Sequence, residues 1–351
     1  MNFIKSYFSE FDSKKWDSII KTIDGATYLH SSDMIKYYTA FDKKIKNLSF
    51  LVRDQELNYV ACVVIGITKT KSKNIYSFSE TLCPTPALID AKYSIRNRIK
   101  KYVWNEILTI SKKFNIKILK LIQLPINNQC LRNKNISSAY SFESLQFLDN
   151  IDVINTLILN LRQSDEKIYN NMSKYRKRDI KRSIKENIKI DVIDFKDTKR
   201  VELEMEEFRL AHLKAAKRIT RPKETWAYME KILKLNKAKL FIATKDQNKL
   251  SFLFCGQFGK SAFGWSQVNY KKYEKTYPVR HYLEWYAIKY FKKKNFLFYE
   301  VGQRYYVNNK SKFSSKEIQI SEFKERYGAK MYPIIYFESA INKINYGELN
   351  N

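Results

Sequence analysis

The chain of 351 residues is poor in glycine, proline and cysteine, of which it has 8, 6 and 4. So few glycines and prolines exclude a collagen-like, low-complexity or linker-rich architecture. The cysteines lie far apart in the sequence and form no C-x-x-C pair, so neither a zinc site nor a disulfide framework is expected. Free thiols in a reducing cytoplasm suit this spacing best.

Long hydrophobic runs are also missing. The longest, residues 60–67, has eight residues, whereas a membrane-spanning helix needs about 20. The first ten residues lack the apolar stretch of a signal peptide. We therefore expect a soluble, cytoplasmic protein, which its charge can also hold against the inner face of a membrane.

Acidic residues are in deficit, with 36 Asp and Glu against 65 Lys and Arg and a net charge of +29. A field of this sign attracts RNA, DNA or anionic lipid, but it specifies no reaction. Hydrophobic residues make up 44% of the chain and aromatic residues 15%, which is enough for folded cores and argues against disorder. The length suits two domains of ordinary size.

The two halves of the chain show the same order of predicted elements about 190 residues apart. Hydrophobic periodicity predicts strand, turn, strand, strand, helix and strand in each half. In the first half these elements are 48–53, 58–67, 73–78, 95–114 and 116–122, and in the second half 239–244, 250–255, 261–267, 281–293 and 295–300. This repeat predicts an α+β protein built by duplication, with one domain at 1–150 and the other at 151–351.

Between the halves lies a strongly basic insert, residues 164–189. Ser164 is a predicted helix N-cap, and acidic residues follow it in the first turn. From 167 to 189 nine Lys and Arg stand against two acids, in what we predict to be one basic helix. It can track an RNA backbone, although a solvated face is the alternative. The predicted RNA-binding residues are Lys174, Arg176, Lys177, Arg178, Lys181 and Arg182.

Several sequence segments, taken in order, resemble the FemX and FemA/FemB family of aminoacyltransferases. They are the basic run at 170–182 with a strand after it, Arg221-Pro222 before a helix, a strand that ends in Glu300-Val-Gly302, and Phe323-Lys324 within 320–328. No single phrase is diagnostic, and the order and spacing over 160–333 carry the resemblance. The long coiled-coil arm of FemA is absent, so the chain is more similar to FemX.

The resemblance implies two tandem GNAT-like domains, each a mixed, mostly antiparallel sheet flanked by helices. It also implies transfer of an amino acid from aminoacyl-tRNA to an amine, usually on a peptidoglycan precursor. Phe323 and Lys324 would then lie at the acyl-transfer centre, and Arg221 beside an anionic acceptor. After Gly302 the sequence departs from FemX, so an amine on another envelope glycan or a small metabolite stays open as acceptor.

Forming an amide from an ester requires stabilisation of the oxyanion and a group that accepts the amine proton. Lys324 can supply the positive charge, and Glu300, at the end of its strand, can accept the proton. The alternatives are a solvated lysine and a capping carboxylate. His281 is expected to pack or cap at a helix start, and none of the three histidines is predicted to be catalytic.

Substrate binding is predicted at four positions. Arg221 can clamp a phosphate through two hydrogen bonds, and a plain surface charge is the alternative. Core packing is the alternative for Trp265, because it falls in a central predicted strand. The predicted substrate-binding residues are Arg221, Trp265, Tyr305 and Arg304.

The acyl donor can be judged from the glycines. Acetyl-CoA sites in GNAT domains use a turn of the form Q/R-x-x-G-x-G/A to cradle the pyrophosphate, and no such turn occurs here. This favours aminoacyl-tRNA, with neither a metal nor a bound cofactor. The expected partners are tRNA and an anionic or lipid-linked envelope precursor, and not DNA. The rivals are an acyl-CoA-dependent N-acyltransferase of a nucleotide-linked amino sugar and a non-catalytic nucleic-acid-binding protein.

Overall fold

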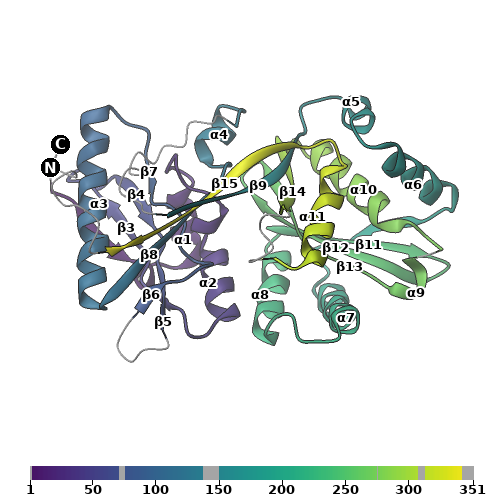
Figure 1. Ribbon diagram of the computed structural model, residues 1–351, viewed down its shortest axis with the longest axis horizontal. Helices are drawn as coiled ribbons and strands as arrows, with labels where there is room; N and C mark the ends of the chain where they lie inside the picture. The colour runs from purple at the N-terminus through teal and green to yellow at the C-terminus, as the bar shows by residue number, and fades with distance from the viewer. Residues whose placement is uncertain (1, 71–75, 137–149, 275, 307–312, 342–351) are drawn as a thin grey trace. The chain divides into compact units, whose positions relative to one another are not determined.

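The computed structural model describes residues 2–70, 76–136, 150–274, 276–306 and 313–341 (Figure 1). The chain divides into two compact units, one of residues 1–153 with 333–351 and one of residues 154–332. The predicted α+β class, with mixed, mostly antiparallel sheets flanked by helices, is confirmed. No helix among these residues has both the length and the apolar composition that crossing a membrane requires.

The first unit contains two sets of hydrogen-bonded strands. The first set, β1-β3-β4-β7, is antiparallel and consists of Ile4–Tyr7, Phe50–Arg53, Tyr59–Val63 and Ala87–Leu88. The second, β15-β8-β6-β5-β2, consists of Lys330–Ala340, Ile116–Gln123, Tyr76–Phe78, Gly66–Lys69 and Lys46–Asn47. The helices are α1 Ser13–Ile20, α2 Ser32–Phe41, α3 Tyr93–Lys113 and α4 Asn128–Arg132.

Two features of this unit differ from the prediction. The single strand predicted at 58–67 is wrong, because β4 and β5 belong to different sets of strands. The chain turns beside Gly66, where a Cβ atom would lie only 2.9 Å from Ile45 Cγ2. The second difference is β15, which was not predicted and whose residues Ile335–Ala340 pair with β8.

The second unit is one sheet with helices on both faces. Its strands, in the order β10-β11-β12-β13-β14-β9, are Lys189–Val192, Ala238–Lys245, Asn248–Phe258, Ser261–Asn269, Phe298–Arg304 and Asn150–Asn160. Neighbouring strands are antiparallel except β13 and β14. The helices are α5 Asp165–Asn170, α6 Lys174–Lys185, α7 Thr198–Ala216, α8 Lys223–Lys234, α9 Lys271–Glu274, α10 Val279–Lys293 and α11 Ser315–Glu325.

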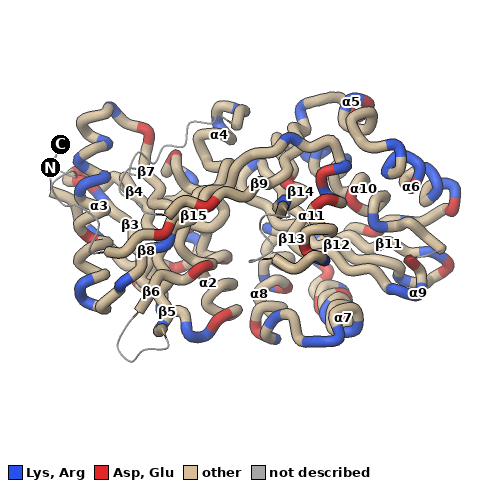
Figure 2. Tube along the Cα trace, in the orientation of Figure 1, with Lys and Arg blue, Asp and Glu red and all other residues tan. Residues whose placement is uncertain are grey.

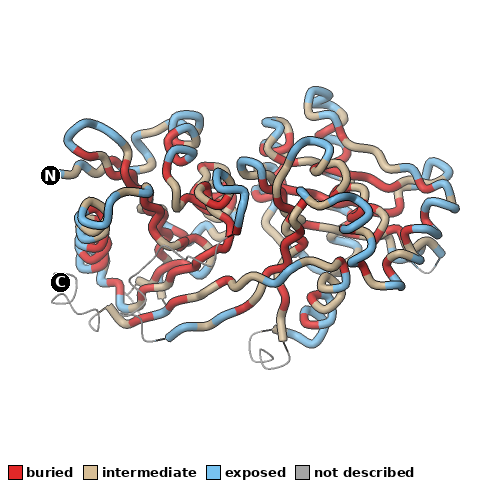
Figure 3. Tube along the Cα trace, turned by 90° about the horizontal axis from the view of Figure 1, so that it is seen from above, coloured by how far each residue is buried: buried red, intermediate tan, exposed pale blue. Residues whose placement is uncertain are grey.

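Strand β12 shows how the two faces are covered. Its side chains alternate between faces, as they must in a strand. Phe252 and Phe254 pack on Phe208 of α7, whereas Leu253 and Cys255 join the core beneath α10. Helices α7 and α8 therefore cover one face, and α10 with α6 the other (Figure 1). Figure 3 shows buried residues running along the strands between these helices.

The continuous basic helix predicted at 167–189 is wrong. Ser164 caps a short helix, α5, as predicted, by accepting a hydrogen bond from the Lys167 amide. The helix then stops, and Ser173 caps a second helix, α6, by accepting from the Arg176 amide. Gly328 packs against the break, so closely that a Cβ on it would lie 2.5 Å from the Asn171 carbonyl oxygen.

Candidate active site

A cavity of about 300 Å³ lies in the second unit, where two neighbouring strands separate. Strands β13 and β14 pair in parallel only over residues 261–263 and 298–300, although both continue beyond this pairing. Because the strands diverge at their carboxyl ends, side chains rather than backbone hydrogen bonds fill the gap. Ligands of sheets with parallel strands bind at such places.

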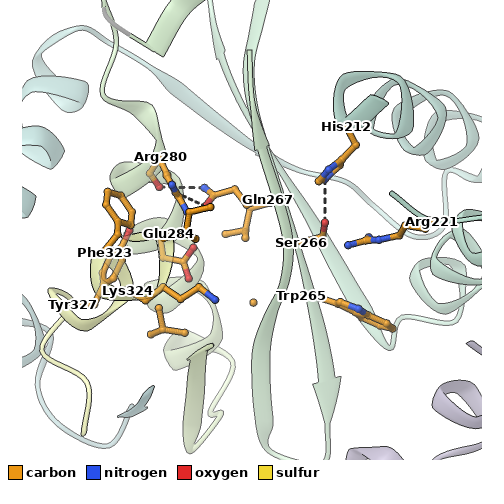
Figure 4. A pocket seen from close by; sticks show the side chains of 14 residues that line it. His212, Arg221, Trp265, Ser266, Gln267, Arg280, Glu284, Phe323, Lys324 and Tyr327 are labelled. Atoms are coloured by element: carbon orange, nitrogen blue, oxygen red, sulfur yellow. Dashed lines mark hydrogen bonds between the residues drawn. The ribbon is translucent and has the colours of Figure 1, made fainter. Parts of the chain in front are cut away.

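A β-bulge in β13 decides which side chains line the cavity. The pairing with β12 shifts between Ser266, opposite Phe254, and Gly264, opposite Cys255, so that Trp265 is an extra residue. An extra residue breaks the alternation of side chains. Trp265 and Ser266 consequently lie on the same side of the strand (Figure 4), and Trp265 lines the cavity.

Three cationic residues line the cavity from different elements. Arg221 precedes α8, Arg280 lies in the first turn of α10, and Lys324 lies in the last turn of α11. Within the described part of the chain, none of the three has a carboxylate oxygen within 4.0 Å. Cations without a direct ion pair favour an anionic ligand.

The position of Lys324 depends on Gly302. A Cβ atom on Gly302 would lie 2.5 Å from Lys324 Nζ, and Gly302 has a φ of +124°, a conformation open to glycine. Burial has the largest effect on the pKa of Lys324 and lowers it; Glu284 raises it, Arg280 lowers it further, and Glu300 raises it least. Lys324 therefore loses its proton at a lower pH than an ordinary lysine does.

The carboxylate that lines the cavity is Glu284, which the sequence analysis did not identify. It is 5% exposed, and the Tyr299 hydroxyl donates a 2.6 Å hydrogen bond to its Oε1. Burial raises the pKa of Glu284, whereas the Tyr299 hydrogen bond, Arg280 and Lys324 lower it. One sequence signal was available: Arg280 and Glu284 are four residues apart on a helix and so share a face.

Glu300 lies on β14 but not among the residues that line the cavity. Its Oε1 accepts a 2.6 Å hydrogen bond from Thr156 Oγ1 of the neighbouring strand β9. Burial raises its pKa, while the Thr156 hydrogen bond and then Lys324 lower it. The carboxylate that reaches the cavity is therefore Glu284 rather than Glu300.

Arg304 and Tyr305, predicted to bind substrate, hold α11 against β14 instead. Arg304 is 9% exposed and pairs with Glu325 at 2.9 Å. The Tyr305 amide donates to Ser321 Oγ at 2.9 Å, and the Tyr305 ring stacks on Phe313 with 3.8 Å between centroids. Neither residue lines the cavity; the Arg304 guanidinium is engaged by Glu325 of α11, and the Tyr305 hydroxyl donates to Gln303 of β14.

Phe323 lines the cavity and lies between two guanidinium groups. The Cζ atoms of Arg176 and Arg280 lie 3.4 and 4.2 Å, respectively, from the centroid of the Phe323 ring. Such cation–π contacts orient a guanidinium without neutralising it. Gln267 holds Arg280 from the other side by accepting a hydrogen bond from its Nε at 3.2 Å (Figure 4). Phe323 thus positions Arg280 in the cavity.

Arg176 departs from its predicted role. It is 3% exposed, donates to His281 Nε2 and, at 2.8 Å, to the Phe323 carbonyl, so it cannot reach an external phosphate. Lys177 is partly buried. The remaining predicted RNA contacts are exposed along α6 (Figure 2), although Arg182 also donates to the Thr276 carbonyl; they are Lys174, Arg178, Lys181 and Arg182.

Two histidines lie in or beside the site. His212 lines the cavity, with its Nε2 3.0 Å from Ser266 Oγ, and burial, with a further effect from Arg221, lowers its pKa to about 4. It is therefore neutral at neutral pH. His281 packs on Phe323 and hydrogen-bonds Tyr327, and it does not cap α10, which begins at Val279.

No family model and no curated protein matches this sequence. Among solved structures, FemX is similar with a TM-score of 0.65 and 10% identity over 95% of this chain and 97% of FemX. L-PGS from Bacillus licheniformis gives 0.57 and 12% identity over 93% of this chain and 91% of that one. A conserved protein of unknown function from Bacteroides thetaiotaomicron gives 0.56 and 8% identity over 96% and 99%. The chain therefore has a FemX-like fold, and the expected resemblance is confirmed at that level.

Proposed function

We propose that this protein is an acyltransferase that forms an amide bond in the cavity beside Lys324. The observation that carries this proposal is the meeting of Lys324, Arg280 and Glu284 at the opening between β13 and β14. These residues come from α10 and α11, and together they offer the positive charge and the proton acceptor that aminolysis of an ester requires. The FemX-like fold supports the same reaction class.

In the proposed reaction an amine nitrogen attacks the ester carbonyl of the donor. Lys324 and Arg280 stabilise the negative charge that develops on the carbonyl oxygen. Glu284 accepts the proton that the nitrogen loses and returns it to the departing oxygen, so that a C–N bond forms while the C–O bond breaks. Its raised pKa suits both proton transfers, because an acid-base catalyst works best near the operating pH.

Aminoacyl-tRNA is the proposed donor. The segment 270–278, which precedes α10, contains no glycine, so the cradle that acetyl-CoA needs for its pyrophosphate is lacking there. The exposed cations of α6 lie in the layer that also contains α10 (Figure 1), whose first turn holds Arg280. A phosphate backbone bound along α6 can thereby lead toward the cavity.

The proposed acceptor is an amine on an anionic envelope precursor. Arg221 and Arg280 reach the cavity without an ion-pair partner among the described residues. A phosphate or carboxylate beside the amine would complete these two groups, since guanidinium binds such anions through paired hydrogen bonds. The amine that carries this anion is identified by testing different acceptors for transfer.

The test compares three probes: tRNA carrying alanine through a stable amide, uncharged tRNA, and acetyl-CoA. Binding is measured at about 0.05 and about 0.2 M salt, because phosphate contacts weaken steeply between these concentrations. We expect tighter binding of charged than of uncharged tRNA at both. Equal, salt-labile binding of the two tRNAs would reduce the interaction to nonspecific charge, and saturable binding of acetyl-CoA would replace the proposed donor.

A pair of variants locates the tRNA contact. Lys174, Arg178 and Lys181, all exposed on α6, are changed together to glutamine. The control changes three exposed lysines of the first unit, Lys101, Lys113 and Lys117. The α6 variant should lower the salt dependence of tRNA binding by the equivalent of about two to three phosphate contacts. Equal effects of both triple variants would contradict an RNA contact at α6.

A further inference from the structure

Exposed aliphatic side chains gather at one end of α7. Ile219, in the connection from α7 to α8, is 78% exposed, more than any other large hydrophobic residue that the structure describes. Leu210 and Leu213, in the last turns of α7, are 47% and 38% exposed. These two leucines are three residues apart and share a face of the helix. Exposure of several aliphatic side chains in one short segment marks an interaction surface.

All the charged side chains of the same segment, residues 210–223, are cationic. It contains five Lys and Arg and no acid, and Lys214, Lys217, Arg218 and Lys223 are exposed. The first half of α7 differs, since it carries Glu202, Glu204, Glu206 and Glu207 against Lys199 and Arg200. Acidic side chains therefore predominate in the first half of α7, whereas exposed aliphatic groups and positive charge without acid meet at its C-terminal end.

This segment also borders the cavity. His212 and Arg221 belong to it and line the cavity (Figure 4), as does Ile320 of α11, which is itself 38% exposed. A partner that binds residues 210–223 therefore lies next to Arg221, which we propose binds the acceptor. The connection between the helices is held in shape by Lys217, the left-handed residue that ends α7.

We propose that residues 210–223 dock the protein on an anionic lipid bilayer. Ile219 inserts at the boundary between headgroups and acyl chains, and Lys217 and Arg218 contact the headgroup phosphates. RNA suits this segment less well, because it contains no Phe, Tyr or Trp on which bases could stack. An aliphatic side chain gains from acyl chains but not from a phosphate backbone.

The proposed docking surface does not depend on the proposed reaction, but one consequence of docking does. If the cavity transfers an acyl group, docking beside Arg221 presents the cavity to molecules in the membrane. The acceptor would then be a lipid-linked amine with an anionic headgroup rather than a freely diffusing one.

The experiment is flotation of the full chain with vesicles of phosphatidylcholine, alone or with about 30% phosphatidylglycerol. Each test variant has a matched control. I219S is paired with L203S, since Leu203 is 72% exposed in the first half of α7, where acidic residues predominate. K217Q/R218Q is paired with K101Q/K113Q, which removes the same charge from exposed positions in the first unit.

We expect the wild-type protein to float with the anionic vesicles only. I219S should weaken this binding about tenfold, and K217Q/R218Q about twentyfold, with the thermal midpoints of unfolding unchanged. Each control should stay within about twofold of wild type.

Three outcomes would overturn the proposal. In the first, the wild-type protein does not float with anionic vesicles, and in the second, the test variants bind vesicles as well as their controls do. In the third, K217Q/R218Q weakens binding of tRNA while I219S leaves vesicle binding intact, which would make the segment an RNA contact. Failure of the proposed reaction is a separate result, because it is measured as transfer from charged tRNA in the absence of vesicles.

Discussion

Replacing Lys324 by methionine separates a contribution to activity from a contribution to stability. Burial lowers the pKa of Lys324, so the folded state binds its proton less well than the unfolded chain does. At neutral pH the native protein therefore loses stability by keeping this amine charged, and removing the charge relieves that cost. Methionine is also unbranched and of similar length. We expect the free energy of unfolding to stay within about 1 kcal/mol of wild type or to rise.

Activity should respond in the opposite direction. Loss of one preorganised group that stabilises an oxyanion lowers kcat about 10²- to 10³-fold, or about 2.7 to 4 kcal/mol. The pH profile should change as well, because Lys324 lowers the pKa of Glu284. Without Lys324 the pKa of Glu284 rises, so the acidic limb of the kcat/KM profile should move to higher pH.

The assay follows labelled alanine from alanyl-tRNA to amines that carry a phosphate or a carboxylate, and urea unfolding is measured in parallel. Lys316→Met is the matched control, since Lys316 is exposed on the same helix, α11. If Lys324→Met retains activity within about threefold of this control, Lys324 does not stabilise the oxyanion and the reasoning is refuted. A fall in activity that only tracks a fall in stability would refute it equally.

Three further predictions follow from the same structure. Gly302→Ala should lower stability by about 1 to 3 kcal/mol in urea unfolding, and activity with it, because the new Cβ would lie 2.5 Å from Lys324 Nζ at a φ of +124°; an unchanged variant would show that Lys324 is not held there. Glu284→Gln should lower kcat about 10²-fold or more and abolish the acidic limb of the pH profile, whereas Glu300→Gln should not, and the reverse order would return the role to Glu300. Burial lowers the pKa of His30 to about 4, so its stabilising effect is complete above pH 6.5 and is lost toward pH 4, by about 3 kcal/mol; urea midpoints of His30→Gln should therefore fall less over this range than those of wild type.

Local signals were sufficient for many elements of this chain. Ser164 was correctly predicted as a helix N-cap. The hairpin of β11 and β12 and the strand β8 were likewise predicted close to their observed bounds. Hydrophobic periodicity and caps depend on residues within one or two turns, so they are written into the sequence itself.

The break between α5 and α6 shows where such signals end. The segment 167–189 was predicted as one helix, yet α5 ends at Asn170 and α6 begins at Lys174, and Gly328, distant in the sequence, packs against Asn171 at the break. Pairing of β15 with β8 has the same origin, since it joins distant parts of the chain. A contact over that separation leaves no mark in either segment alone.

The sequence predicted the α+β class and contained the positive charge, and its resemblance to FemX pointed to Lys324, Phe323 and Arg221, which line the cavity. Only the tertiary structure decided which side chains meet them. A bulge re-aims Trp265 into the cavity, and packing of α10 brings Glu284 there. The physical reason is that helix and strand periodicity fixes the face on which a side chain lies, whereas the divergence of two strands, set by everything packed around them, fixes which faces enclose a site.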